Sequence, residues 1–159
     1  MFKQVFRGPL SETATVASQL GTPGELRADS VGNIFQLFKV GSIAVQACAA
    51  VQLESTNGTN GYQVAPASIA NHGAIGFANQ VNSTATYAVG AYFWAQKYGV
   101  GSVNLTVTAA ANIMLFASVS GKLTSAVAQS SHVGACARCL ADVTGSVPAL
   151  AFINCLQGF

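Results

Sequence analysis

The residue types in this chain best suited to chemistry are the cysteines near the C-terminus. Cys136 and Cys139 form a Cys-Ala-Arg-Cys motif, with His132 before it and Cys155 after it. Three thiolates and an imidazole could bind zinc, but such sites place the two close cysteines on a tight turn. Here residues 133–143 alternate as a strand does, which directs Cys136 and Cys139 to opposite faces. A redox motif would need a following helix. We expect buried, small apolar thiols and neither a metal nor another cofactor.

The same cysteines suggest a second interpretation, a cross-strand disulfide. If residues 144–147 form the loop of a hairpin, Cys136 lies opposite Cys155 on the next strand. That placement suits a disulfide once the chain reaches an oxidising medium. Four cysteines do not make a disulfide scaffold in a chain of this size, so we expect such a bond to be incidental to function.

Catalytic side chains of other kinds are scarce. Of five acidic residues, only Glu54 and Asp142 lie beyond residue 30, which leaves no obvious pair of carboxylates for acid–base catalysis. The two histidines stand in no nucleophile or metal pattern, and the glycines form no nucleotide-binding turn or phosphate loop. We therefore expect that the chain is not an enzyme.

The aromatic residues Tyr92, Trp94 and Tyr98 could form a stacking platform for a sugar. Aromatic residues in a strand pattern more often belong to a core or a protein interface. Both faces of the segment Ala85–Lys97 are apolar. That suits a strand with a core on one side and a subunit contact on the other, or a strand buried on both faces within one monomer. We take Tyr92 and Trp94 as candidate partner contacts.

The composition departs from that of an ordinary soluble domain. Only 8% of residues are charged and 51% are hydrophobic, whereas roughly a quarter of residues are charged in typical domains. Seven of the twelve charged residues lie within the first 39 positions, so Ser, Thr, Asn, Gln, Gly and Ala must cover the rest. A surface so poor in charge favours association. We expect a homo-oligomer.

The composition also argues against two classes of partner. A net charge of +2 with scattered basic residues supplies no basic stripe for nucleic acid. Polar residues interrupt the charge-free interval between Glu54 and Lys97, so it lacks the roughly 20 consecutive apolar residues of a membrane-spanning helix. The N-terminus lacks the order of a secretory signal. We expect no direct nucleic-acid or membrane partner, and a chain that stays in the compartment where it is made.

Residues 1–30 are expected to form an extended N-terminal arm. They contain two of the four prolines and the only dense charge in the chain. Apolar side chains here would be unusual in a solvated tail and favour docking on a neighbouring subunit, although an ordered loop or a frayed terminus is the alternative. The candidate contacts of this arm are Phe2, Phe6, Arg7, Glu25 and Arg27.

Beyond the arm, residues 31–159 have the pattern of β-strands in a single body. Short runs of β-branched and aromatic residues alternate with turn residues, and no stretch has helical periodicity. We expect an all-β fold, a small antiparallel barrel or sandwich, with a turn at Tyr98-Gly99-Val100-Gly101. The predicted strands are Ile34–Val40, Ile43–Glu54, Gly61–Val64, Ala74–Ala78, Ala85–Lys97, Ser102–Val107, Ala111–Val119, Lys122–Val127, Val133–Val143 and Pro148–Leu156.

Several segments occur in a characteristic order along residues 20–156. Leu20-Gly21-Thr22 precedes the strand Gly32–Lys39, Ala74–Ala78 follows, and residues 90–99 read Gly-Ala-Tyr-Phe-Trp-Ala-Gln-Lys-Tyr-Gly. Next come residues 109–115, Ser120-Gly121-Lys122-Leu123 and the closing pair 133–143 and 147–156. This order resembles the small head decoration, or capsid cement, proteins of tailed bacteriophages.

That resemblance implies a β-rich protein that binds the outer surface of the major capsid protein lattice and stabilises the head. It implies a dimer or trimer at a local symmetry axis, no catalytic residues, and a place on the capsid exterior of the virion after synthesis in the host cytoplasm. The alternatives are a tail, baseplate or fibre component and, from another class, a carbohydrate-binding module.

Overall fold

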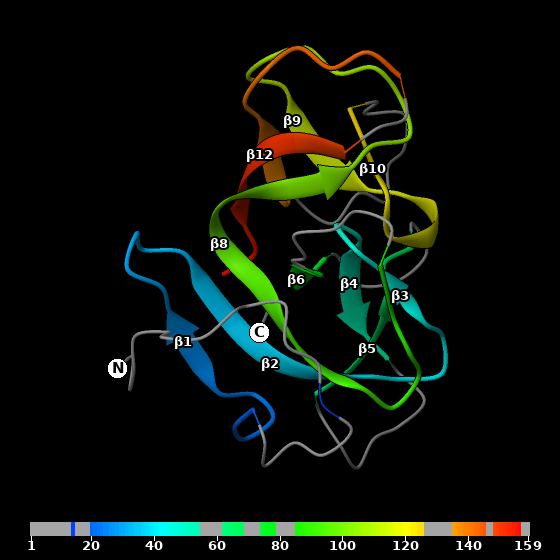
Figure 1. Cartoon of the computed structure of the whole chain (residues 1–159). Coiled ribbons are helices and arrows are strands. Elements are labelled where there is room, and N and C mark those ends of the chain that lie inside the picture. The colour runs from blue at the N-terminus through cyan, green and yellow to red at the C-terminus, as the bar shows by residue number, and fades with distance from the viewer. Residues whose placement is uncertain are drawn as a thin grey trace.

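The computed structural model describes residues 14, 20–54, 62–68, 74–78, 85–125, 135–145 and 148–156. In these ranges the regular elements are strands, apart from one 3-10 turn, η2 (Val119–Gly121), so the all-β prediction is confirmed (Figure 1). Among these residues no helix is long and apolar enough to cross a membrane.

In chain order the strands are β1 (Leu26–Ala28), β2 (Ile34–Val40), β3 (Val45–Gln46), β4 (Ala50–Leu53), β5 (Gln63–Pro66), β6 (Gly76–Ala78), β7 (Thr86–Tyr87), β8 (Tyr92–Asn104), β9 (Met114–Ala117), β10 (Leu123–Thr124), β11 (Ala137–Cys139) and β12 (Pro148–Asn154).

Strand β8 connects two groups of strands (Figure 1). Its first part pairs with β2 and β6, and the order β2, β5, β4, β6, β8 returns to β2, so these strands form a closed circuit. Its second part pairs with β12, and β11, β9 and β10 follow in that order. A parallel bridge between Leu105 and Leu123 joins β10 to the chain just after β8. Among the pairs of named strands, only β2–β5 is parallel.

The strands pack around two main apolar clusters, because alternate side chains along a strand share a face. Each cluster comes mostly from one group, although Ala50 of β4 and Phe77 of β6 belong to the second cluster. The cluster of the first group contains Phe38, Val40, Val51, Phe93 and Ala95 among others. The cluster of the second group includes Val103, Leu115, Leu123, Ile153 and three of the four cysteines, namely Cys136, Cys139 and Cys155. Strand β8 contributes to both clusters.

A β-bulge in β8 separates its two parts. Phe35 pairs with Gln96 and Ile34 with Tyr98, so Lys97 is an extra residue opposite β2. A bulge of this kind bends a strand and shifts its alternation. Both Gln96 and Lys97 are therefore buried, at 1% exposure each.

The bulge also explains why the turn predicted at residues 98–101 is wrong. Gly99 has φ of 103°, and a Cβ atom there would overlap Oδ1 of Asn33, which accepts a hydrogen bond from Val100 N at 3.1 Å. The glycine therefore allows a positive φ and the close approach of the Asn33 side chain, while the strand continues past it.

Two other predicted strands are divided in the structure. The segment Ile43–Glu54 contains Cys48 with φ of 60°, and the chain bends there between β3 and β4. The segment Ala85–Lys97 is interrupted before Tyr92 by a turn with Gly90 at φ of 84°. In both cases a residue with positive φ interrupts the extended backbone, although the sequence pattern predicts one continuous strand.

We expect Gly99→Ala to lower the free energy of unfolding by about 2 to 3 kcal/mol, because the substitution adds a clash with Asn33 to the strain of a positive φ. Gly32→Ala is the matched control: φ there is 90°, but no atom lies within 4 Å of the added Cβ. Strain alone costs about 1 kcal/mol at this control position. Urea unfolding followed by tryptophan fluorescence measures both values, and equal losses would contradict the role given to Gly99.

Candidate functional site

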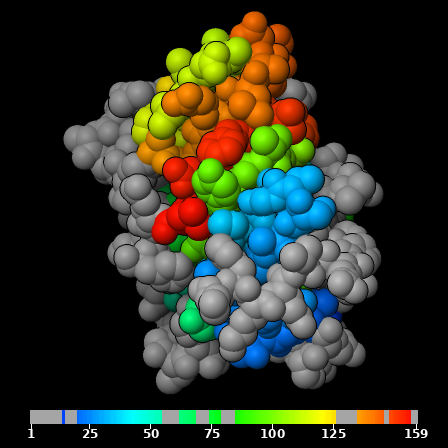
Figure 2. All heavy atoms as spheres, turned by 90° about the vertical axis from the view of Figure 1, so that its left-hand side faces the viewer, coloured from blue at the N-terminus to red at the C-terminus, as the bar shows by residue number. Residues whose placement is uncertain are grey.

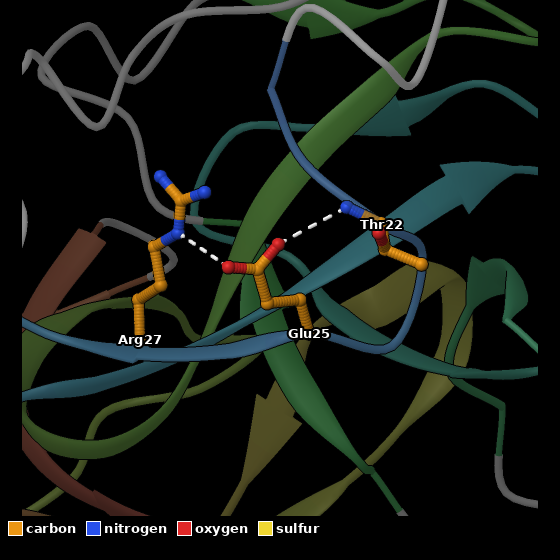
Figure 3. Close-up of polar contacts among 3 residues, drawn as sticks. All are labelled: Thr22, Glu25 and Arg27. Carbon is orange, nitrogen blue, oxygen red and sulfur yellow. Dashed lines mark hydrogen bonds and ion pairs between the residues drawn. The ribbon is translucent and has the colours of Figure 1, made fainter. Parts of the chain in front are cut away.

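The structure brings four of the seven predicted contact residues together, at the place where the N-terminal segment crosses β8. Arg27 of β1 lies over the ring of Trp94, with Cζ 4.7 Å from the ring centroid. Its Nε donates to Oε1 of Glu25 at 3.0 Å, and Thr22 N donates to Oε2 of the same carboxylate at 3.0 Å (Figure 3). The fourth residue, Tyr92, begins β8.

The local sequence explains this arrangement. Glu25 and Arg27 are two residues apart on an extended chain, so their side chains share one face. A turn precedes them, in which Glu25 N donates to Thr22 O at 2.9 Å and Gly24 has φ of 86°. The carboxylate thus closes the turn and holds the guanidinium over the indole, with side-chain exposures of 24% for Glu25 and 21% for Arg27.

Trp94 itself lies inside the chain, at 1% exposure. It packs with Phe35 and Leu37 of β2 and with Ala14 and Leu20 of the N-terminal segment. Strand β8 is therefore buried on both faces within one monomer at this point, which is one of the two interpretations that the sequence allowed.

Tyr92 is half-buried, and Lys39 Nζ lies 5.8 Å from its ring centroid. Ala14 and Tyr92 exchange backbone hydrogen bonds of 3.2 and 2.8 Å. Together with β1, which pairs with β2, Ala14 places these parts of residues 1–30 on the chain's own body. Phe2, Phe6 and Arg7 lie outside the described residues. Contact of any of the seven residues with a partner stays a prediction.

The cysteines are free and buried. Cys139 faces inward as predicted, but the prediction that Cys136 faces the other way is wrong: both belong to one apolar cluster, because Cys136 lies just before β11. Among the described residues no group of three or more His, Cys, Asp or Glu side chains could hold a metal. His132 lies outside those residues.

Cys136 and Cys155 are close together, as expected for a hairpin. The register is shifted by one residue from the predicted pairing, since Ala137 pairs with Ile153, but Cys155 Sγ still lies 3.6 Å from Cys136 O. A hydrogen bond with the Cys136 thiol, together with burial, raises the pKa of Cys155 well above its ordinary range. The Cys155 thiol is therefore protonated and a poor nucleophile at neutral pH.

Sequence reasoning missed the buried amine of Lys97. Its Nζ donates to Gln36 Oε1 at 3.1 Å, and Gln36 Nε2 donates to Gly24 O at 3.0 Å. These bonds link β8, β2 and the turn before β1. The only signal in the sequence is a Gln-Lys pair within an otherwise apolar strand.

Comparison with solved structures finds a similar fold in a protein of bacteriophage phi29, the N base of its head fiber gp8.5. The TM-score is 0.52 and the sequence identity 9%, over 77% of this chain and 94% of that one. At this identity the similarity concerns the fold alone. No protein-family model and no curated protein sequence matches the chain.

We expect Arg27→Ala to shift the emission of Trp94 to longer wavelength, because the guanidinium that covers the indole is removed. Trp94 is the single tryptophan, so the spectrum reports on this site alone. The free energy of unfolding should fall by about 1 kcal/mol. Lys122→Ala, which also removes one positive charge, should leave the emission unchanged, and an unshifted Arg27→Ala spectrum would contradict the contact.

Lys97 generates a second prediction, on pH. Burial lowers the pKa of Lys97 below its ordinary value of 10.5, an effect that nearby Cys155 opposes. In the window between the folded and unfolded pKa values the unfolded chain binds more protons, so the contribution of this group to stability rises with pH. The free energy of unfolding of the wild type minus that of Lys97→Met should therefore increase as the pH rises toward 10.5, the ordinary pKa of lysine.

The subtraction removes most of the opposite effect of Cys48 and Cys155, whose pKa values are raised in the folded chain, so that both thiols ionise more easily in the unfolded chain. Urea unfolding at several pH values provides the measurement. A difference that is constant or falls with pH would show that folding does not lower the pKa of Lys97.

Proposed function

We propose that this chain is a structural protein of a tailed-bacteriophage virion, a head decoration protein that binds the outer surface of the major capsid protein lattice. The observation that carries the proposal is the fold similarity to a phage head-fiber base, which extends over 94% of that chain. The resemblance in segment order to head decoration proteins supports it independently of the fold.

The physical properties of the chain suit this role. A protein that binds only the assembled shell stabilises the shell by mass action, and many copies can do so without catalysis or a cofactor. Only 8% of the residues in the chain are charged, so its surface loses little charge hydration when it is covered by protein. We propose that Phe2, Phe6 and Arg7 contribute to attachment, and that the protein lies on the capsid exterior after synthesis in the host cytoplasm.

The base of a head fiber is the second candidate, because the similar structure is named as such a base. It differs from a decoration protein in carrying a further protein outward from the head. A carbohydrate-binding module is less well supported, because Trp94 is 1% exposed and so cannot stack on a sugar in this conformation.

Cryo-electron microscopy of purified particles, with and without added protein, tests the proposal. We expect density on the outer surface of the head at repeated lattice positions. Density only at the tail or baseplate, or no density at a large molar excess of protein, would contradict it. Density from which a further fiber projects would favour the second candidate.

Attachment through the arm gives a more specific prediction. Deleting residues 1–13 keeps Ala14 and Leu20, which pack on the body, so circular dichroism and the melting temperature should stay close to those of the intact protein. Occupancy on particles should fall, and more steeply at high salt if exposed ion pairs contribute. Equal occupancy of truncated and intact protein through a salt series would show that residues 1–13 do not contribute to binding.

A further inference from the structure

The outer face of strands β8, β12, β11 and β9 is apolar and open to solvent. Along β12, Ala149, Ala151 and Ile153 are buried, whereas Leu150 is 52% exposed and Phe152 half-buried on the other side. Figure 2 shows this side of the molecule, where β12 in red lies between β8 in green and residues 135–145 in orange. Strand alternation thus places one face on the core and leaves the opposite face without cover from the described residues.

The exposed side chains form one continuous patch across the strands. Phe152 pairs with Val100 on β8 and with Arg138 on β11, and Arg138 pairs with Met114 on β9. Val100 is 47% exposed and Met114 44% exposed. Neighbouring strands lie about 4.8 Å apart, so these four residues form a row of cross-strand neighbours. Interface centres are enriched in aromatic residues, Met and Arg.

Arg138 is the one charged residue that lines the groove in this patch. The groove has a volume of about 430 Å³, and Arg138 shares it with Met114, Leu140 and Phe152. Within the described ranges no acidic residue pairs with Arg138; the ion pair found there joins Arg27 and Glu25. A guanidinium in apolar surroundings is stabilised when a carboxylate of a partner reaches it.

The same face carries an acidic group at one end. Asp142 is exposed, and its Oδ1 accepts a hydrogen bond from Ala111 N at 2.7 Å. Ala111 adjoins Asn112, which lines the groove. The patch therefore has a cation near its centre and an anion at its rim, with no ion pair to either within the described part of the chain.

We propose that a second copy of this chain covers the patch in a two-fold dimer, with Arg138 of each copy paired to Asp142 of the partner subunit. In a two-fold interface the same surface meets itself, so a contact of one residue with another is made twice. The two-fold rotation brings the apolar centres of the two copies together and places the cation of each copy near the anion of the other. The surface is therefore complementary to itself. The proposal does not rest on the proposed function.

The size of the patch sets the expected strength of the dimer. The footprint is roughly 330 Å² per copy, because seven residues each of β8 and β12, four of β9 and three of β11 contribute, at about 3.3 Å per residue on strands about 4.8 Å apart. A standard stable interface buries about 800 Å² per partner. We therefore expect a weak dimer with a dissociation constant in the micromolar range, which becomes populated when copies are held close together.

Sedimentation velocity over a concentration series, up to about 200 µM, tests the proposal on the full-length protein. The wild type should shift from monomer to dimer. Arg138→Glu and Asp142→Lys should each weaken association by about tenfold or more, and the double charge swap should restore most of it. Lys122→Glu, which makes the same change in net charge as Arg138→Glu at a residue that does not line the groove, should associate as the wild type does. Circular dichroism confirms that each variant is folded.

Recovery in the double swap cannot result from misfolding of the single variants, so it identifies the pair specifically. A wild type that stays monomeric throughout the series overturns the proposal and leaves the patch to a different protein. Association that Arg138→Glu does not weaken, or that the double swap does not restore, overturns it as well. A trimer that does not respond to these variants would show that copies meet through another surface.

Discussion

The bulge at Lys97 is the constraint on which the rest of the structure depends, because a single strand must serve two apolar clusters. Before the bulge β8 pairs with β2 and β6, and after it with β12. A bend of this kind leaves backbone groups without ladder partners, and such groups need other hydrogen bonds when they are buried. Gln96 supplies them: its Nε2 donates to the carbonyl oxygens of Tyr98 at 3.2 Å and Val100 at 3.1 Å. The two buried polar side chains of β8 thus fix the place of the bend.

This geometry also decides which surfaces remain for partners. Because β8 passes under the N-terminal segment before the bulge, Trp94 is covered by Leu20, Arg27 and their neighbours. After the bulge the shifted alternation turns Tyr98 and Val100 onto the open face, where Val100 is 47% exposed. The same strand therefore presents an apolar surface twice. The first part is covered by the chain itself, and the second is available to another molecule.

The sequence predicted the elements that depend on local pattern. Strand β2 has the predicted bounds, and β12 begins at Pro148 as predicted, because both are alternating runs bounded by turn residues. It did not predict the closed circuit, since strand pairing is non-local and periodicity does not encode it. The turn predicted at Gly99 is wrong because a glycine at a bulge and a glycine in a turn occur in the same local sequence pattern. Of the candidate site, the residue types were found, but the burial of Trp94 follows only from where residues 14 and 20 lie.

The scarcity of charge has a structural explanation that composition alone does not reveal. Each acidic residue that the structure describes accepts a hydrogen bond from a backbone amide, so the carboxylates hold turns and loops in place. Glu25 binds Thr22 N, Asp29 binds Val31 N and Asn33 N, Glu54 binds Ser42 N, and Asp142 binds Ala111 N. Carboxylates engaged in this way hold loops in place and contribute less to keeping copies apart than free surface charges do. Outside the loops, the sheet faces then have few charged groups to oppose contact between copies. This is the condition under which an open apolar face such as that of β12 favours association.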